Sequence, residues 1–257
     1  MDDWRVKTEK HIADVGTLLG YTANNILAYV AEPEARARIA VHAFGGTLED
    51  FTIPELVAGF CDFTTACEVL DVSPLAVLRA RCADGAVSEM LCCVLENSFE
   101  LLPALDAEGG GPARYAAIAE ALAFRAPDHD MSKLAEPEAA MFAEFTPGLS
   151  GLVFGSAEYW ATLDKMPALA HHYEHNRHHP QHFDDGICGM NIVDLIEMFC
   201  DWYASGRRHA TGNILKSIDI NTPRFELAPD IACVFVNTAP IFERIDQHLN
   251  EKAEVPS

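Results

Sequence analysis

Positive charge is scarce in this sequence of 257 residues. Only 18 residues are Lys or Arg, against 39 that are Asp or Glu, so the formal net charge is −21. A surface this acidic repels phosphate backbones and anionic lipid headgroups. We therefore expect neither a protein that coats nucleic acid nor one that binds a membrane surface.

Long apolar runs are missing as well. No stretch approaches the roughly 20 residues that a membrane-spanning helix needs. No apolar segment follows the charged N-terminal string MDDWRVKTEK, as it would in a secretory signal. The eight cysteines contain no CxxC pair. We interpret them as reduced, mostly buried thiols of a cytoplasmic protein rather than as zinc ligands.

The alternating pattern of β-strands is scarce, whereas Ala, Leu and Glu dominate the periodic stretches. In residues 191–205, apolar side chains recur on one helical face, with Asp194, Glu197 and Asp201 together beside it. A second long helix is expected from about Pro229 to Leu249. The sequence therefore predicts an all-α fold.

Three pairs of related strings occur in the same order in the two halves of the chain. AEPEA stands at 31–35 and 135–139, FTIPELVAGFCDF (51–63) parallels MNIVDLIEMFCDW (190–202), and LCCVLENS (91–98) parallels IACVFVNT (231–238). The offset is 104 residues for the first pair and 139 or 140 for the others, because the first half lacks a histidine-rich segment. We interpret residues 1–105 as a helical, degenerate duplicate and residues 112–250 as a metal-binding domain. The glycine-rich stretch 106–112 is the candidate linker.

Histidine is the residue that stands out, because six of the 11 histidines lie between His171 and His182. The second half contains, in order, His129-Asp130, the pairs His171-His172 and His178-His179, and Asp201. Divalent metals in proteins are held by several neutral imidazoles and at least one carboxylate. The pattern predicts a centre for one or two divalent ions, with Fe, Mn, Zn, Ni and Co not distinguished. The alternative is a solvated helix that binds nickel adventitiously.

This order of motifs on an all-α chain resembles the HD-domain superfamily of metal-dependent phosphohydrolases. HDMSK (129–133) is similar to the HDxGK string of the HD-GYP branch, and HHPQHFDDGICGM (178–190) looks like its HHExxDGxGYP, without the GYP tripeptide. Over roughly residues 112–240 the chain also resembles a small group of bacterial and phage HD-like proteins known only as a domain of unknown function.

The resemblance implies an HD-type helical bundle and a set of metal ligands. That set comprises His129, Asp130, His172, one or both of His178 and His179, and Asp201. It also implies that Asp130 and Lys133 are catalytic and that Lys133 holds a substrate phosphate.

Two residues stay ambiguous at this level. The family's first histidine is absent from the second half, where Tyr115 stands in its region, while His11 in KTEKHIADV has the right local pattern. Either His11 reaches across to complete the site or the site lacks that ligand. Asn176 either contacts substrate, fixes a histidine tautomer or caps a turn.

Three functions are compatible with this pattern. The first is a phosphohydrolase acting on a nucleotide or small phosphate ester, in which the metal lowers the pKa of a bound water from about 15.7 toward 7. The second is a diiron oxygenase, because some HD-domain proteins hold mixed-valent iron with the same ligand order. The third is a non-enzymatic metal-dependent sensor or scaffold. We expect a small anionic substrate, and the sequence leaves the oligomeric state open.

Overall fold

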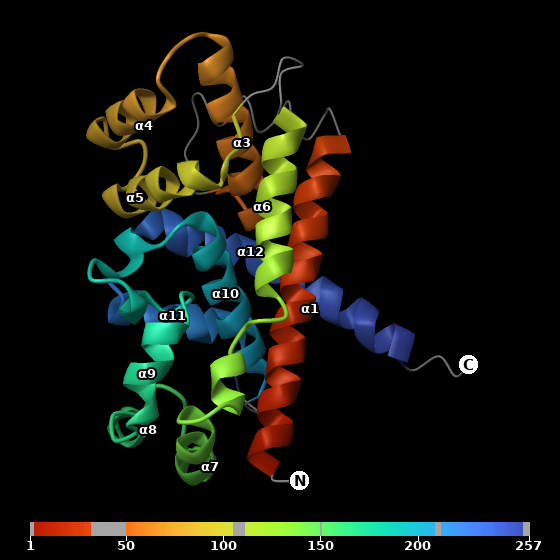
Figure 1. Ribbon diagram of the computed structural model, residues 1–257, viewed down its shortest axis with the longest axis vertical. Coiled ribbons are helices and arrows are strands. Elements are labelled where there is room, and N and C mark those ends of the chain that lie inside the picture. The colour runs from red at the N-terminus through yellow and green to blue at the C-terminus, as the bar shows by residue number, and fades with distance from the viewer. Residues whose placement is uncertain (1–2, 32–49, 105–110, 150, 209–211, 254–257) are drawn as a thin grey trace.

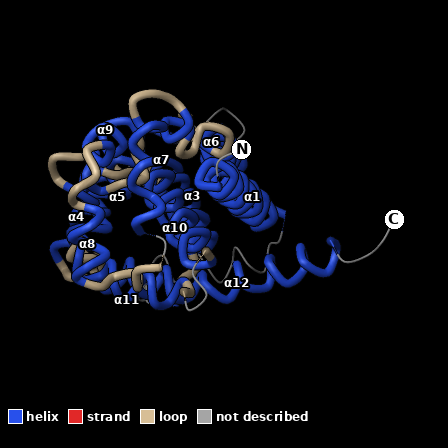
Figure 2. Tube along the Cα trace, turned by 90° about the horizontal axis from the view of Figure 1, so that it is seen from below, coloured by secondary structure: helices blue, strands red, loops and turns tan. Residues whose placement is uncertain are grey.

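The computed structural model describes residues 3–31, 50–104, 111–149, 151–208 and 212–253 (Figure 1). Within these ranges every regular element is helical and there is no strand, as Figure 2 shows. The predicted all-α fold is confirmed. None of the helices described here is both long and apolar enough to cross a bilayer.

The helices follow one another along the chain with short connections. The α-helices are α1 (Asp3–Ala31), α3 (Ile53–Val69), α4 (Pro74–Ala83), α5 (Glu89–Asn97), α6 (Gly111–Arg125), α7 (Glu138–Leu149), α8 (Ala157–Leu163), α9 (Ala168–His175), α10 (Ile192–Arg207), α11 (Ile214–Arg224) and α12 (Pro229–Ala253). Four short 3₁₀ helices are η2 (Ser98–Leu101), η3 (Met131–Leu134), η4 (Pro180–His182) and η5 (Gly186–Gly189). The two helices expected from residues 191–205 and from Pro229 are α10 and α12.

Helix α1 packs along α6 and against α10 (Figure 1). Its buried side chains recur every three or four residues, from His11 through Val15, Leu18 and Thr22 to Ile26. This spacing places them on one face of a helix. The helix of the first half that carries His11 is therefore held against elements of the second half.

Residues of both halves belong to one buried hydrophobic cluster. Phe60 and Val94 from the first half lie in the same cluster as Phe199 and Phe235 from the second. The expected linker lies mostly outside the described residues, as does most of the first AEPEA string. The two halves thus share a core rather than each burying its own.

The repeated strings form equivalent hydrogen bonds across the two halves. The backbone N–H of Ile53 donates to Oγ1 of Thr238 at 2.8 Å, and the N–H of Ile192 donates to Oγ of Ser98 at 2.8 Å. Ile53 and Ile192 occupy matching positions in one pair of strings, and Ser98 and Thr238 do so in another. The reciprocal pattern supports the interpretation of a duplication in which each half caps a helix of the other.

All eight cysteines are free thiols. Four of them are buried, and the other four are half-buried. Burial raises the pKa of the Cys61 thiol to about 12. The interpretation of the cysteines as core residues therefore holds fully for four of them.

Candidate metal centre

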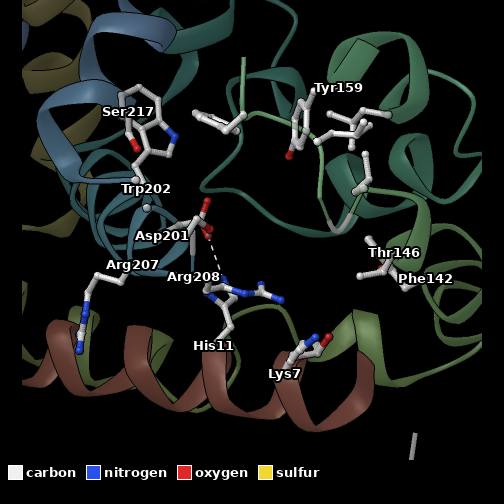
Figure 3. A pocket seen from close by; sticks show the side chains of 18 of the residues that line it. Lys7, His11, Phe142, Thr146, Tyr159, Asp201, Trp202, Arg207, Arg208 and Ser217 are labelled. Carbon is white, nitrogen blue, oxygen red and sulfur yellow. Dashed lines mark hydrogen bonds and ion pairs between the residues drawn. The ribbon is translucent and has the colours of Figure 1, made fainter. Parts of the chain in front are cut away.

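His11 reaches from α1 to the second half of the chain. Its Nε2 lies 2.9 Å from Oδ1 of Asp201 and 3.4 Å from Oδ2 of Asp130, and its side chain is 1 % exposed. Figure 3 draws the contact with Asp201. Of the two alternatives for His11, the structure shows the first. Tyr115 instead lies in the core, with its hydroxyl donating to the carbonyl oxygen of Ala58 at 3.2 Å.

Asp130 stands at the centre of the cluster, in the turn between α6 and η3. Its Oδ2 faces His11 and lies 3.5 Å from Nε2 of His129, whereas its Oδ1 lies 3.3 Å from Nε2 of His172 and 3.6 Å from Nε2 of His178. Each carboxylate oxygen thus faces a different set of imidazoles. Asp130 could therefore take part in holding a cation on either side of its carboxylate.

The backbone of Asp130 is held in an uncommon conformation. Its φ of 56° and ψ of 11° lie in the left-handed region, which costs a residue other than glycine on the order of 1 kcal/mol or more. The side chain is completely buried. In this conformation the buried carboxylate faces four histidines, His11, His129, His172 and His178.

Two groups of donor atoms meet at Asp130. One comprises His11, His129, Asp130 and Asp201, and the other comprises Asp130, His172, His178 and His179. Within each group, the ligand atoms all lie within 4.8 Å of one another. Four nitrogen and oxygen donors at this separation match the coordination number of common divalent sites. The predicted ligands, which are separated in sequence, are therefore brought together, and both His178 and His179 take part.

Glu197, on α10, orients two of the imidazoles. Its Oε1 lies 2.9 Å from Nδ1 of His129 and 3.3 Å from Nδ1 of His178. An ionised carboxylate only accepts hydrogen bonds, so the Nδ1 atoms donate and the Nε2 lone pairs are left for another partner. Glu138, at the start of α7, acts in the same way on Nδ1 of His172 at 3.0 Å.

Three of these inward-facing atoms have no hydrogen-bond partner. They are Nε2 of His129, Nε2 of His178 and Oδ1 of Asp130, and all three are buried. Buried polar atoms without a partner are rare, because each costs the desolvation of a polar group. A divalent cation in each of the two groups would give these atoms partners, so the residues present fit a metal.

The protonation states also suit a metal. Burial works against charge on Asp130, but the positive charge of Lys133, together with the neighbouring histidines, outweighs it and holds its pKa well below the usual range. Burial and the neighbouring histidines keep the pKa of His179 well below its ordinary value, and burial with Lys133 lowers that of His172. These groups are thus present as carboxylate and neutral imidazoles, the forms that bind metals.

His129 differs from the other imidazoles. Burial lowers its pKa, but the negative charges of Asp130, Glu197 and Asp201 outweigh burial and raise it above the ordinary value. In the absence of a cation, this ring therefore holds a proton to a higher pH than a free histidine does. A metal that binds here displaces that proton.

Lys133, on η3, lies at the edge of the cluster and at the cavity beside it. Its Nζ contacts Oδ2 of Asp130 and lies 5.4 Å from the centre of the Phe142 ring. It is also one of the residues that line the cavity. Its place between the Asp130 carboxylate and open space is the place expected for a cation that holds a substrate anion.

Asn176 lies behind the cluster rather than on the cavity wall. It is the C-cap residue of α9, and its Nδ2 donates to Oγ of Ser132 and to the carbonyl oxygen of His172, both at 2.8 Å. The same nitrogen lies 3.0 Å from Nδ1 of His172. Asn176 thus takes one of the expected roles, capping the end of α9.

The other three clustered histidines lie outside both groups. His171 contacts Glu138 through Nδ1 at 2.7 Å and stacks on the exposed His175. The Nδ1 of His182 lies 3.0 Å from the carbonyl oxygen of Tyr173. The histidine-rich segment therefore divides into three inward rings and three that face elsewhere, which differs from a solvated helix.

Two carboxylates of the site, Glu197 and Glu138, were not predicted from the sequence to belong to it. Glu197 precedes Asp201 by one helical turn on α10, so the spacing could have found it. Glu138 carries no local signal, since it reaches His172 from a different helix. Arg125 fixes Glu197 from the other side, donating to its Oε2 at 2.8 Å.

A cavity of about 1170 Å³ opens beside the cluster. Lys7 and His11 on α1 lie along one side of it, Asp201, Arg207 and Arg208 face them, and Tyr159 and Phe142 close a third side (Figure 3). Seven of the 18 Lys and Arg residues of the chain line it, against three of the 39 Asp and Glu residues. An otherwise acidic protein thus concentrates positive charge at one place.

The fold and the site together define an all-α protein with a buried histidine–carboxylate cluster that could hold a metal. A family model described as "Family of unknown function (DUF5662)" matches residues 112–241, half of the chain, and the protein belongs to this family. No curated protein and no solved structure matches it. The match contains all of the candidate ligands except His11.

Proposed function

We propose that this protein is a metal-dependent phosphohydrolase that acts on a nucleotide or another small phosphate ester. The observation that carries the proposal is the distribution of charge: the cavity beside the cluster gathers seven cationic side chains in a chain of net charge −21. Positive charge in a cleft raises the local concentration of an anionic substrate. Phosphate esters combine the negative charge that the cavity attracts with oxygen atoms that a divalent cation binds.

The side chains of the cluster divide the work of such a reaction. Asp130 would hold divalent metal together with His11, His129 and Asp201 in one group and with His172, His178 and His179 in the other. When bound, the metal supplies a hydroxide near neutral pH and stabilises negative charge on the phosphoryl oxygens. Glu197 and Glu138 keep the imidazoles turned inward.

Lys133 would act on the substrate itself. Its ammonium lies against Asp130 and lines the cavity, so a phosphoryl oxygen bound at the cluster comes within its reach. A fixed positive charge at that position stabilises the charge that develops in the transition state. Removing one such donor typically slows a reaction by a factor of about 100 to 1000.

The test is phosphate release by protein loaded with Mn²⁺, Zn²⁺ or Fe²⁺, measured over a panel of nucleotides and phosphomonoesters. We expect turnover by the wild type, loss of turnover in Asp130→Asn, and a decrease of about 100-fold or more in Lys133→Ala. Lys165→Ala is the matched control, since Lys165 is exposed and does not line the cavity. A metal-replete wild type that releases no phosphate from any member of the panel would refute the proposal.

A diiron oxygenase is the second candidate, and the donor set supports it. Five imidazoles and two carboxylates surround the two positions, and imidazole suits iron as well as zinc or manganese. Purified protein would then contain about two irons per chain, give an EPR signal on partial oxidation and consume oxygen with its substrate. Bound metal without phosphate release or oxygen consumption would instead support the sensor or scaffold.

A further inference from the structure

A second set of cations lines the cavity on α11 and at the end of α10. It consists of Arg208, which follows α10, and of Lys216 and Arg224 on α11. Among the residues that the structure describes, no carboxylate lies within ion-pair distance of any of the three. The chain has 39 acidic residues, yet these three cations face the cavity without an acidic partner. They therefore form a positively charged surface that is available to an anionic ligand.

Arg224 is held in place by aromatic rings rather than by an acid. Its guanidinium carbon lies 4.6 Å from the centres of both the Trp160 and Phe225 rings, and Nη1 donates to Oδ1 of the buried Asn221 at 3.4 Å. Phe225 in turn stacks on Trp202, with an angle of 10° between the rings. Because the rings contact the flat faces of the guanidinium, the N–H groups at its edge remain able to donate to an oxyanion. The side chain is already ordered, so binding costs little additional conformational entropy.

Arg208 lies at a defined distance from the metal cluster. It follows Asp201 by seven residues at the end of the same helix, which places it two turns along, about 10 Å, on the same face. Figure 3 shows both residues on the side of the pocket that faces α1. A ligand with two or three linked phosphates could reach from the cluster at Asp201 to the guanidinium of Arg208, because the arginine side chain covers part of this distance.

Aromatic side chains occupy the wall next to these cations. Tyr159 and Trp160 on α8 lie edge to face, with 5.1 Å between ring centres, and both line the cavity. Burial raises the pKa of Tyr159, and the positive charges of Arg224 and Arg208 act against that rise, so both arginines lie within electrostatic reach of its hydroxyl. The cations and the rings therefore border the same space.

We infer that Arg208, Lys216 and Arg224 form a second oxyanion subsite, which binds a phosphate of the substrate other than the one at the metal cluster. The rings of Tyr159 and Trp160 beside it contact an aromatic part of the same molecule. The ligand class is an aromatic compound with two or more phosphates, of which a nucleoside diphosphate is the simplest probe. The inference rests on the proposed function only for the group that occupies the metal cluster.

Tryptophan fluorescence provides the measurement, because all three tryptophans of the chain line this cavity. Metal-loaded protein is mixed with adenosine, AMP or ADP in a stopped-flow instrument, which reads binding within milliseconds and ahead of turnover. We expect ADP to bind at least tenfold more tightly than AMP, and adenosine to bind most weakly. Equal dissociation constants for AMP and ADP, or no quenching by any of the three, would overturn the inference.

Variants locate the subsite. We expect the ADP preference to fall to about twofold in the double variant Arg208→Ala/Lys216→Ala. It should stay unchanged in Arg244→Ala, which removes a positive charge from α12 outside the cavity. A double variant that keeps the tenfold preference would contradict the assignment. Arg208→Gln and Lys216→Gln, made singly, give the same comparison with less effect on folding.

The outcome is separable from that of the proposed function. If the protein is not a phosphohydrolase, the nucleotides bind with these affinities but release no phosphate. If the subsite does not exist, phosphate release proceeds while AMP and ADP bind equally. The two measurements are made on the same metal-loaded protein, so each failure is recognised by itself.

Discussion

Glu197 holds two candidate ligands through a single carboxylate oxygen. His129 and His178 both direct Nδ1 toward its Oε1, while Arg125 donates to its other oxygen. The arrangement turns two Nε2 atoms toward Asp130 and leaves them without hydrogen-bond partners. At the scale of single residues, the site is thus made as much by the carboxylates behind the rings as by the rings themselves.

The first prediction concerns this role. Glu197→Gln should weaken metal binding by about 10- to 100-fold. A neutral amide orients the two imidazoles less firmly than a carboxylate does, and it makes their Nε2 atoms weaker metal ligands. The measurement is a competition titration with a chromophoric chelator. Glu174→Gln, at an exposed position on α9, is the matched control, and equal affinities for the two variants would contradict the role of Glu197.

The second prediction concerns pH. Despite burial, hydrogen bonds from His129 and His178 hold the pKa of Glu197 below its ordinary value, and a contact with His11 does the same for Asp201. In the unfolded chain these groups protonate near pH 4, whereas the folded protein keeps them ionised to lower pH. Their stabilising contribution is therefore complete above about pH 5 and is lost as the pH falls toward their folded pKa values.

The measurement is chemical denaturation of the metal-free protein between about pH 3 and 7. The free energy of unfolding should fall on the acid side, with a smaller decrease in Glu197→Gln because that variant has one such group fewer. The same acid dependence in wild type and variant would show that Glu197 does not contribute.

At the scale of elements, the two halves of the chain exchange equivalent contacts. Besides the bonds of Ser98 and Thr238 to helix N-termini, Nδ2 of Asn97 donates to the carbonyl oxygen of Met190 at 3.0 Å. At the matching position, Nδ2 of Asn237 donates to the carbonyl oxygen of Phe51 at 3.1 Å. The helices that begin at Ile53 and Ile192 both have a capping box. Reciprocal bonds of this kind are what a duplication would produce, and the duplication stays a prediction.

The third prediction follows from these bonds. Ser98→Ala and Thr238→Ala should each lower the free energy of unfolding by about 1–3 kcal/mol, because each leaves a buried backbone N–H without an acceptor. Denaturant titration measures both values. Thr17→Ala is the control, since the exposed hydroxyl of Thr17 donates to the carbonyl oxygen of Ala13 within the same helix. A loss in one variant but not in the other would argue that the two bonds are not equivalent.

The interpretation of the first half as a degenerate duplicate stays a prediction. At an offset of 104, Asn25 and Ile26 stand where the second half has His129 and Asp130, and Ile26 is fully buried in the core. Ile26 lies within helix α1, whereas Asp130 lies in the turn after α6, so the two positions differ in local structure. The first half nevertheless supplies His11, so it supports the site of its counterpart rather than holding one of its own.

At the scale of the whole molecule, the candidate ligands come from α1, the turn after α6, α9 and the segment that follows it, and α10. These elements meet only in the folded chain. A metal held by these residues would therefore bind only the native state and would stabilise it, by about 2.7 kcal/mol at a free metal concentration 100 times the dissociation constant. This would couple metal content to folding.

The fourth prediction is a fall in melting temperature on metal removal. Treatment with a chelator should lower Tm by about 5–10 °C, and added Mn²⁺ or Zn²⁺ should restore it. In His11→Ala the metal-dependent difference should shrink, whereas in His175→Ala, which alters an exposed ring outside both groups, it should persist. A Tm that does not respond to chelator would contradict the metal centre.

The sequence by itself determined the helical class, the boundaries of α10 and α12 to within a few residues, and the residue types of the metal ligands. It could do so because helix periodicity and imidazole–carboxylate chemistry are local properties. Only the tertiary structure decided that His11 joins the cluster, that Glu138 and Glu197 orient the rings, and that Arg208 and Arg224 border one cavity with Tyr159. These contacts depend on how helices that are far apart in the chain pack against one another. The shared core sets which distant residues meet, and no regular spacing in the sequence indicates such a contact.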